Sequence, residues 1–118
     1  MHSMKKFVVM YRVPVETMEK WKKTNSPEEM QKQGKELGEK MMAWTNKNKA
    51  AFVGDVVALG KNKRMTKDGV EDISNDLNGF SVIEAENAEA VIAMFRDNPH
   101  FDIPTSFLDF MEVPHMGM

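Results

Sequence analysis

The sequence predicts an α+β fold in which a four-stranded antiparallel sheet carries two helices on one face. Four segments rich in β-branched and aromatic residues indicate strands, and two segments with apolar residues at helical spacing indicate helices. At 118 residues the chain has the usual size of one domain. We therefore expect a single domain over residues 1–118, with the first three residues, "MHS", a cloning remnant outside the fold.

The first strand is predicted from Lys6 to Val13, within "KKFVVMYRVP", and is expected to end at Pro14. Its apolar residues alternate on both sides: Phe7, Val9 and Tyr11 on one, Val8 and Met10 on the other. Because both sides are apolar, both faces of the sheet should be covered.

A long helix is predicted after Ser26, which suits the N-cap position, while Pro27 suits the first turn and Glu29 completes a capping box. The helix should end near Asn48. One apolar stripe follows it at spacings of three and four: Met30, Gly34, Leu37, Met41 and Trp44. Glycines weaken a helix interior, so Gly34 and Gly38 predict a close approach of the sheet. A short helix is expected before it, from the spacing of Val15, Met18 and Trp21.

The remaining elements follow in order. "AAFVGDVVALG", residues 50–60, predicts the second strand, and the polar segment after it should form a small hairpin at Asp68 and Gly69. "GFSVIEAE" predicts the third strand. Asn87 should cap the next helix, which Pro99 ends because a residue before proline avoids helical geometry. "FLDFMEVP" predicts the last strand.

This β-α-β-β-α-β order is the ferredoxin-like plan, and right-handed crossovers place both helices on one face of the sheet. The opposite face would expose an apolar surface too large for a monomer. A second copy of the same sheet is the simplest cover, so we expect a homodimer through the helix-free face, a dimeric α+β barrel.

Composition limits the function. A net charge of −2 gives no reason to expect nucleic acid or membrane as a partner. The chain has no cysteine, which excludes disulfides, thiolate metal sites and cysteine nucleophiles. No metal-ligand spacing, phosphate loop or dinucleotide fingerprint occurs, so no metal or cofactor is expected.

Consecutive blocks of the chain, "MKKFVVMYR", "SPEEMQK", "VGDVVALGKNKRMT", "DGVEDISNDLNGFSVIEAENAEA" and "NPHFDIP", resemble the YCII-related (DGPF-domain) family. The resemblance implies a ferredoxin-like dimeric barrel in the cytoplasm, with one pocket per subunit and, for most members, no assigned reaction. The family's "DGPF" reads "DGVE" here, and an "HPHL"-like stretch reads "NPHF", with Asn98 replacing its first histidine. The suspected histidine–aspartate dyad of some members is missing, because the long helix contains no histidine.

Two residues are candidates for acid or base catalysis. His100 is the only histidine away from the termini and could transfer protons near neutral pH, or it could be a loop histidine bonded to a backbone carbonyl. Asp55 interrupts an apolar strand, which is costly unless it is paired or faces a pocket. The alternative is a bulge near Gly54 that turns Asp55 to solvent.

Three residues are candidates for binding. Tyr11 and Trp44 could line a cavity, although aromatic residues at such spacing more often belong to the core. Lys61 begins the basic stretch "KNKR", which could hold an anionic ligand or form a solvated turn.

Two functions therefore remain open. One is a module that binds a small molecule in the barrel without turnover. The other is a cofactor-independent enzyme, an isomerase, lyase or hydrolase that uses His100 or Asp55 as acid or base on a small carbonyl or lactone-like substrate.

Overall fold

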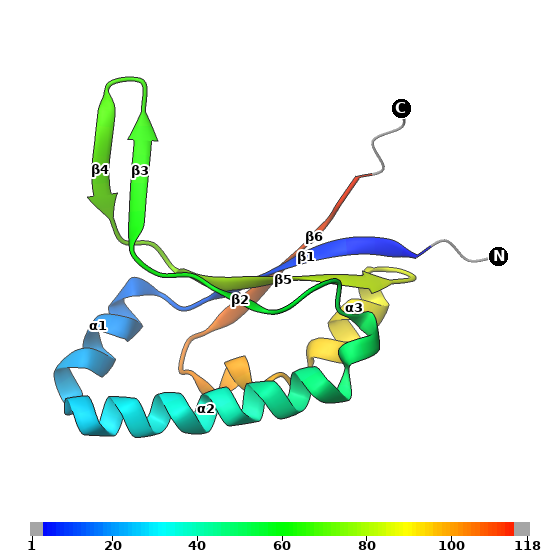
Figure 1. Cartoon of the computed structure of the whole chain (residues 1–118), viewed down its shortest axis with the longest axis horizontal. Coiled ribbons are helices and arrows are strands. Elements are labelled where there is room, and N and C mark those ends of the chain that lie inside the picture. Colours follow the sequence, from blue (N-terminus) through cyan, green and yellow to red (C-terminus); the bar gives the residue numbers. More distant parts are fainter. Residues whose placement is uncertain (1–3, 115–118) are drawn as a thin grey trace.

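The computed structural model describes residues 4–114, so the "MHS" prefix, His2 and His115 lie outside the described residues. Four strands form one antiparallel sheet in the order β2-β5-β1-β6 (Figure 1). They are β1 (Lys5–Arg12), β2 (Val57–Ala58), β5 (Leu77–Ala85) and β6 (Phe107–Glu112). The strand order is compatible with a ferredoxin-like fold.

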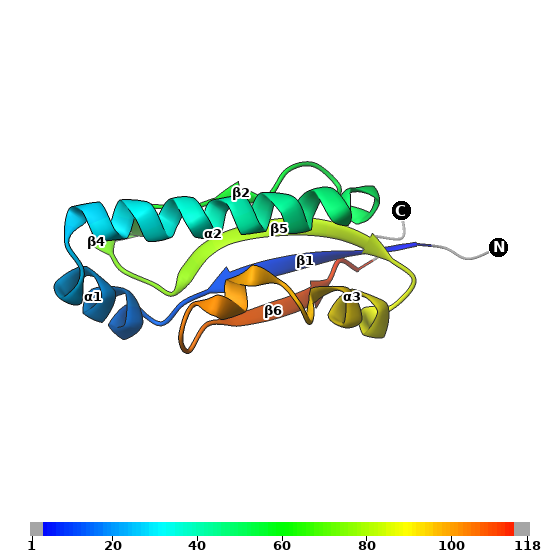
Figure 2. The ribbon, with the colours of Figure 1, turned by 90° about the horizontal axis from the view of Figure 1, so that it is seen from below.

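The helices are α1 (Val15–Thr24), α2 (Pro27–Lys47) and α3 (Ala88–Phe95), with short 3-10 turns η1 (Lys49–Ala51) and η2 (Pro99–Asp102). All lie on the same side of the sheet (Figure 1), as predicted. Seen from below, α2 runs along one side, while α1, η2 and α3 follow one another along the other (Figure 2). Among the described residues, no helix is long and apolar enough to cross a membrane.

The two helix caps and the hairpin that the sequence predicts are present in the structure. Ser26 Oγ accepts a hydrogen bond from the Glu29 N–H at 3.1 Å, and Glu29 Oε1 accepts one from the Ser26 N–H at 2.9 Å, so the capping box is confirmed. Asn87 Oδ1 caps α3 by accepting from the Ala90 N–H at 2.8 Å. The predicted hairpin forms from β3 (Asn62–Thr66) and β4 (Gly69–Ile73), and its two-residue turn is Lys67–Asp68, one position before the predicted Asp68–Gly69.

The predicted second strand over residues 50–60 is largely wrong. Only Val57–Ala58 pair as a strand, and Phe52 makes an isolated bridge to Ile83. From Phe52 to Val57 the chain advances five residues while β5 advances three, from Ile83 to Phe80. The surplus is taken up at Gly54, whose φ of +82° breaks the extended backbone.

The expected close approach at the helix glycines is also wrong. A Cβ added at Gly34 or Gly38 would meet no atom within 4 Å. The sheet does not come near this part of α2, and both glycines are exposed. They therefore weaken the helix without a packing gain.

The core sits at one end of the helix-covered face. It is built from β1, β5, the C-terminal half of α2 and α3, and its fully buried members include Phe7, Val9, Ile83, Val91 and Phe95. Trp44 packs its ring on Phe95, with 4.7 Å between ring centroids. The apolar stripe of α2 therefore reaches the core only through its last turns.

Candidate functional site

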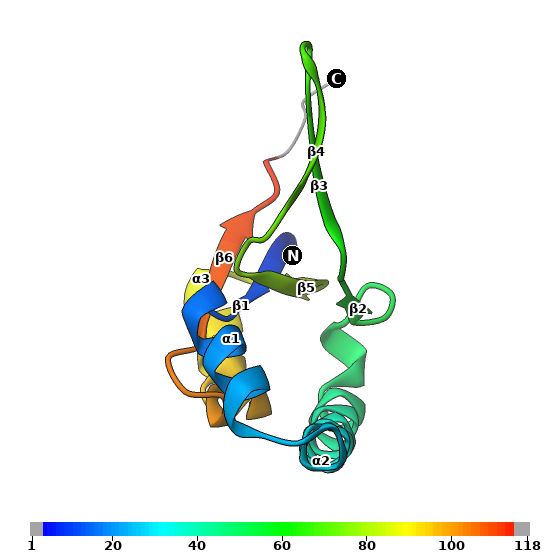
Figure 3. The same cartoon turned by 90° about the vertical axis from the view of Figure 1, so that its left-hand side faces the viewer.

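A cleft of ≈ 740 Å³ lies at the other end of the helix-covered face. Its walls are α1, the N-terminal half of α2, and η2 with the loop that follows it, and its floor is the end of the sheet. The ribbons of α1 and α2 stand apart in the end-on view (Figure 3). The apolar lining residues are Val13, Met18, Trp21, Leu37, Ile103 and Pro104.

The walls are joined by side-chain hydrogen bonds. Trp21 Nε1 donates to Gln33 Oε1 at 2.5 Å, which ties α1 to α2. Lys40 Nζ lies 3.2 Å from Asp102 Oδ2, which ties α2 to η2. Both ends of this ion pair are more than half exposed, so it contributes little stability, and the walls are held mainly by their connections to the rest of the fold.

The cleft carries balanced charge. Its charged lining residues are two lysines, Lys20 and Lys40, and two acids, Glu36 and Asp102. Since Lys40 and Asp102 pair with each other, neither sign dominates. The cleft therefore suits a ligand without net charge that has an apolar body and a few hydrogen-bonding groups.

His100 closes the cleft where η2 meets the sheet. It is 6% exposed, and its Nε2 lies 2.9 Å from the backbone carbonyl oxygen of Arg12. A carbonyl only accepts, so Nε2 carries the proton in this contact. The ring also stands edge-on to Tyr11, with 5.5 Å between centroids, and these two contacts fix its orientation.

Burial is the largest influence on His100 and lowers its pKa below the ordinary value of a histidine. Hydrogen bonding to the backbone of Arg12 and Phe107 acts in the opposite direction, but is weaker. His100 is therefore neutral near pH 7, with the Nε2 proton donated and a lone pair on Nδ1.

The local sequence explains how η2 presents this histidine. Asn98 has an extended ψ of 130°, as expected for a residue before proline, and its Oδ1 accepts from the His100 N–H at 2.8 Å. Asn98 is 2% exposed, and its Nδ2 has no hydrogen-bond partner among the described residues.

A β-bulge brings Asn78 into the cleft. The register of β1 with β5 pairs Tyr11 with Gly79 but Arg12 with Leu77, so Asn78 is an extra residue. Bulges re-aim side chains, and Asn78 lines the cleft floor. Gly79 is required beside it, because a Cβ there would lie 2.7 Å from the Val57 carbonyl oxygen.

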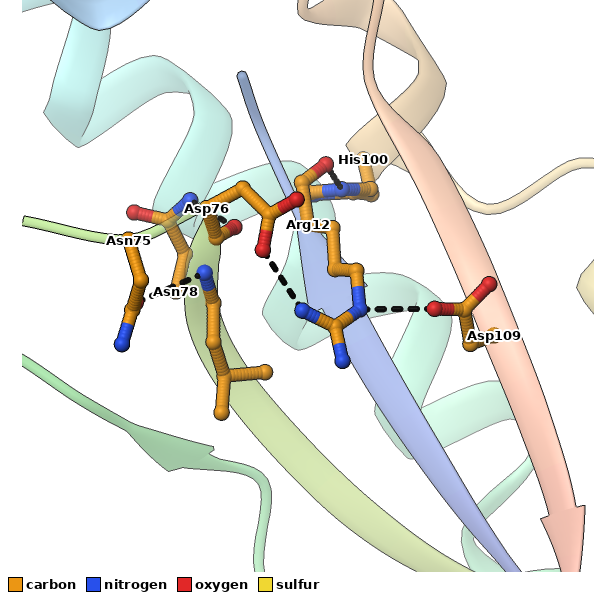
Figure 4. A network of polar contacts seen from close by, with 7 residues as sticks. Arg12, Asn75, Asp76, Asn78, His100 and Asp109 are labelled. Carbon is orange, nitrogen blue, oxygen red and sulfur yellow. Dashed lines mark hydrogen bonds and ion pairs between the residues drawn. The ribbon is translucent and has the colours of Figure 1, made fainter. Parts of the chain in front are cut away.

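Arg12 links His100 to two acids, Asp76 and Asp109 (Figure 4). Its backbone carbonyl accepts from His100, while its guanidinium donates to Asp76 at 2.5 Å and to Asp109 at 2.6 Å. The hydrogen bond to Asp76 is the largest influence and raises the pKa of Arg12. Both acids therefore hold the end of β1, and with it the carbonyl that orients His100.

The structure brings only one of the five candidate residues to the cleft lining, namely His100. Tyr11 is buried behind it and hydrogen-bonds Ser81 Oγ at 2.9 Å, and burial raises its pKa. Trp44 is buried in the core and donates from Nε1 to Asp97 Oδ1 at 2.9 Å. These two aromatic residues occupy core positions.

Asp55 and Lys61 are exposed and do not line the cleft. Asp55 follows Gly54 in the irregular segment before β2, where the chain turns it toward solvent. Lys61 lies in the turn before β3, with a positive φ of 43°. Asp55 therefore faces solvent next to the break at Gly54, and Lys61 lies in a solvated turn, which were the alternatives to a functional role.

Several cleft residues were not among the sequence candidates. Met18, Trp21 and Leu37 form the apolar walls, and Asn78 forms part of the floor. The sequence did contain signals for them. The apolar spacing of both helices indicated the wall residues, and the "NG" pair within a strand indicated Asn78, since a glycine inside a strand often marks a bulge.

No known protein family matches this chain, and no curated protein matches it either. Among residues 4–114 no group of three or more histidine, aspartate or glutamate side chains is placed to hold a metal ion.

Proposed function

We propose that this protein binds a small, uncharged and largely apolar organic molecule in the cleft between α1, α2 and η2. The observation that carries the proposal is the cleft itself, ≈ 740 Å³ in volume and lined by apolar side chains from three elements. Its size is typical of small-molecule sites, and the polar groups at its closed end, His100 and Asn78, would orient the ligand. The resemblance to YCII-related proteins in the sequence blocks supports a pocket of this kind.

The two helix glycines provide a matched test. Gly34 lines the cleft and Gly38 does not, yet both are exposed α2 positions where a side chain meets nothing. Gly34→Leu should project a side chain into the cleft and reduce binding of the neutral dye Nile red at least tenfold, as measured by its fluorescence. Gly38→Leu should leave binding unchanged. Equal binding by both variants would reject the cleft as the site.

A second proposal is proton transfer in the same cleft, with His100 as the base. It is favoured by the neutral ring, its fixed orientation and its position in the lining. The chemistry would be a cofactor-independent isomerase, lyase or hydrolase reaction on a small carbonyl or lactone-like compound. With such a compound that binds, His100→Asn should abolish turnover while the dissociation constant changes less than tenfold; unchanged turnover would reject the role.

We further propose that the chain is a homodimer through the helix-free face of the sheet, which would make an α+β barrel. The apolar residues that the strand register places on this face are Val8, Met10, Val57, Phe80, Val82, Phe107 and Met111. Three of them, Val57, Phe107 and Met111, are 38–40% exposed in the single chain, so burial against a second copy would stabilise the fold. Light scattering should return twice the chain mass of 13.5 kDa, and a monomer at micromolar concentration would reject the proposal.

A further inference from the structure

The β3–β4 hairpin stands away from the rest of the protein. It rises from the helix-free side of the sheet (Figures 1 and 3), and within the described part of the chain its two strands pair only with each other. None of its residues is buried, and only Asn62 and Ile73 at its base are half-buried. A lone two-stranded hairpin is marginally stable in water, so packing against another surface would stabilise it.

One side of the hairpin carries an apolar pair. Met65 pairs with Val70 across the strands, and these side chains are 81% and 62% exposed. On the same side, Lys63 Nζ lies 2.6 Å from Asp72 Oδ1, so the neighbouring charges satisfy each other. This side of the hairpin therefore presents an exposed apolar pair next to two charges that neutralise each other. Such a surface suits an uncharged protein surface better than nucleic acid or an anionic membrane.

The length of the hairpin fixes what it can reach. Five residues of strand span about 17 Å, whereas two packed sheets lie about 10 Å apart. The hairpin would therefore extend past a second sheet packed on the helix-free face. It would lie along the flank of that second sheet. The hairpin belongs to the same side of the molecule as the proposed dimer face, so the surface it meets there is the second copy (Figure 3).

The area of the sheet face also favours a contact between the hairpin and a second copy of the chain. The strands β2, β5, β1 and β6 have 2, 9, 8 and 6 residues. At about 3.3 Å per residue and about 4.8 Å between strands, they give a flat area of about 400 Å². Stable interfaces bury about 800 Å² on each partner, so the sheet face alone is small for a stable dimer. A hairpin face of about 17 by 10 Å adds roughly 170 Å² from each copy and receives as much from the other.

We propose that the β3–β4 hairpin is a dimerisation arm whose Met65–Val70 pair packs on the flank of a second copy of this chain. The inference rests on the proposed dimer and adds the element that enlarges its interface and raises its affinity. Each copy contributes one arm and receives one, as two-fold symmetry requires.

The test exchanges the apolar pair for an ion pair. Met65→Glu with Val70→Lys keeps the net charge and supplies a cross-strand pair like Lys63–Asp72, so the hairpin itself is preserved. The control is Met42→Glu on α2, a methionine that is 67% exposed on the helix side. Sedimentation velocity over a dilution series gives the dimer dissociation constant for each protein.

We expect the dimer dissociation constant of the hairpin variant to be at least tenfold higher than that of the wild type, and that of Met42→Glu to be unchanged. A wild-type dimer that the hairpin variant matches in affinity would overturn the arm and leave the dimer standing. A wild-type chain that is monomeric throughout would overturn both.

A second measurement uses the absence of cysteine. A thiol introduced by Met65→Cys should react with a maleimide at least tenfold more slowly at dimer-forming concentration than after dilution. A thiol introduced by Lys67→Cys in the turn should react equally at both concentrations. Concentration-independent reaction at position 65 would overturn the arm.

Discussion

The two halves of α2 carry one apolar stripe but have different environments. In the C-terminal half, Trp44 is buried and packs on Phe95, with Met41 beside it. In the N-terminal half, Leu37 and Gly34 face the cleft. The difference comes from the opposite wall, because α3 packs on the sheet at one end whereas α1 buries none of its residues at the other. An apolar stripe therefore shows that a helix has an inner face, and the neighbouring elements decide whether that face meets a core or a cavity.

The largest expected effect comes from removing the anchor of the packed half. Trp44→Ala should lower the free energy of unfolding by about 3–5 kcal/mol, since it empties a closed core position. Leu37→Ala at the cleft should cost less, because the truncated side chain already borders open space. Urea denaturation of both variants measures the contrast, and equal costs would show that the two halves are packed alike.

The fold was predictable where the signals are local. Ser26 with Glu29, and Asn87 before α3, act through neighbours in sequence, and both caps formed as predicted. The predicted hairpin formed too, with its turn one residue earlier, at Lys67–Asp68. The second strand was mispredicted because its apolar composition favoured continuous pairing over residues 50–60, whereas the chain breaks at Gly54 and loses register with β5. The possible bulge near Gly54 was the sequence signal of this break.

A smaller effect is expected at the start of the cleft half. Ser26→Ala removes the acceptor for the Glu29 N–H and should lower the free energy of unfolding by about 1 kcal/mol. Ser26→Asp retains an acceptor at the N-cap and should keep most of the stability. Thermal and urea unfolding would check both variants, and an unchanged alanine variant would mean that the first turn of α2 is frayed.

The smallest expected effect is the pH dependence contributed by His100. Burial lowers its pKa in the folded chain, so the unfolded chain binds this proton more readily. The contribution to stability is complete above the unfolded pKa of about 6.5 and is lost as the pH falls below it. Urea unfolding between pH 7.5 and 5.5 should show a steeper loss in the wild type than in His100→Gln; parallel curves would contradict a buried neutral ring.

The candidate site was less predictable than the fold. His100 could be singled out as the one histidine away from the termini, and its position after Pro99 placed it at the end of a helix. Asn78 could not, because its orientation depends on the cross-strand register at the bulge. Gly34 predicted a close contact and instead borders the cleft, since sequence spacing does not reveal how far the opposing element stands.

The two tryptophans allow a direct test of the cleft, because Trp21 lines it and Trp44 lies in the core. Each gives its own indole N–H signal in a ¹⁵N-correlated NMR spectrum, which can be followed during titration with 2-naphthol, a neutral aromatic probe with one hydroxyl group. We expect the Trp21 signal to shift saturably while the Trp44 signal stays in place, and Gly34→Leu to remove the shift. An unmoved Trp21 signal, or equal shifts of both, would contradict a binding cleft beneath the N-terminal half of α2.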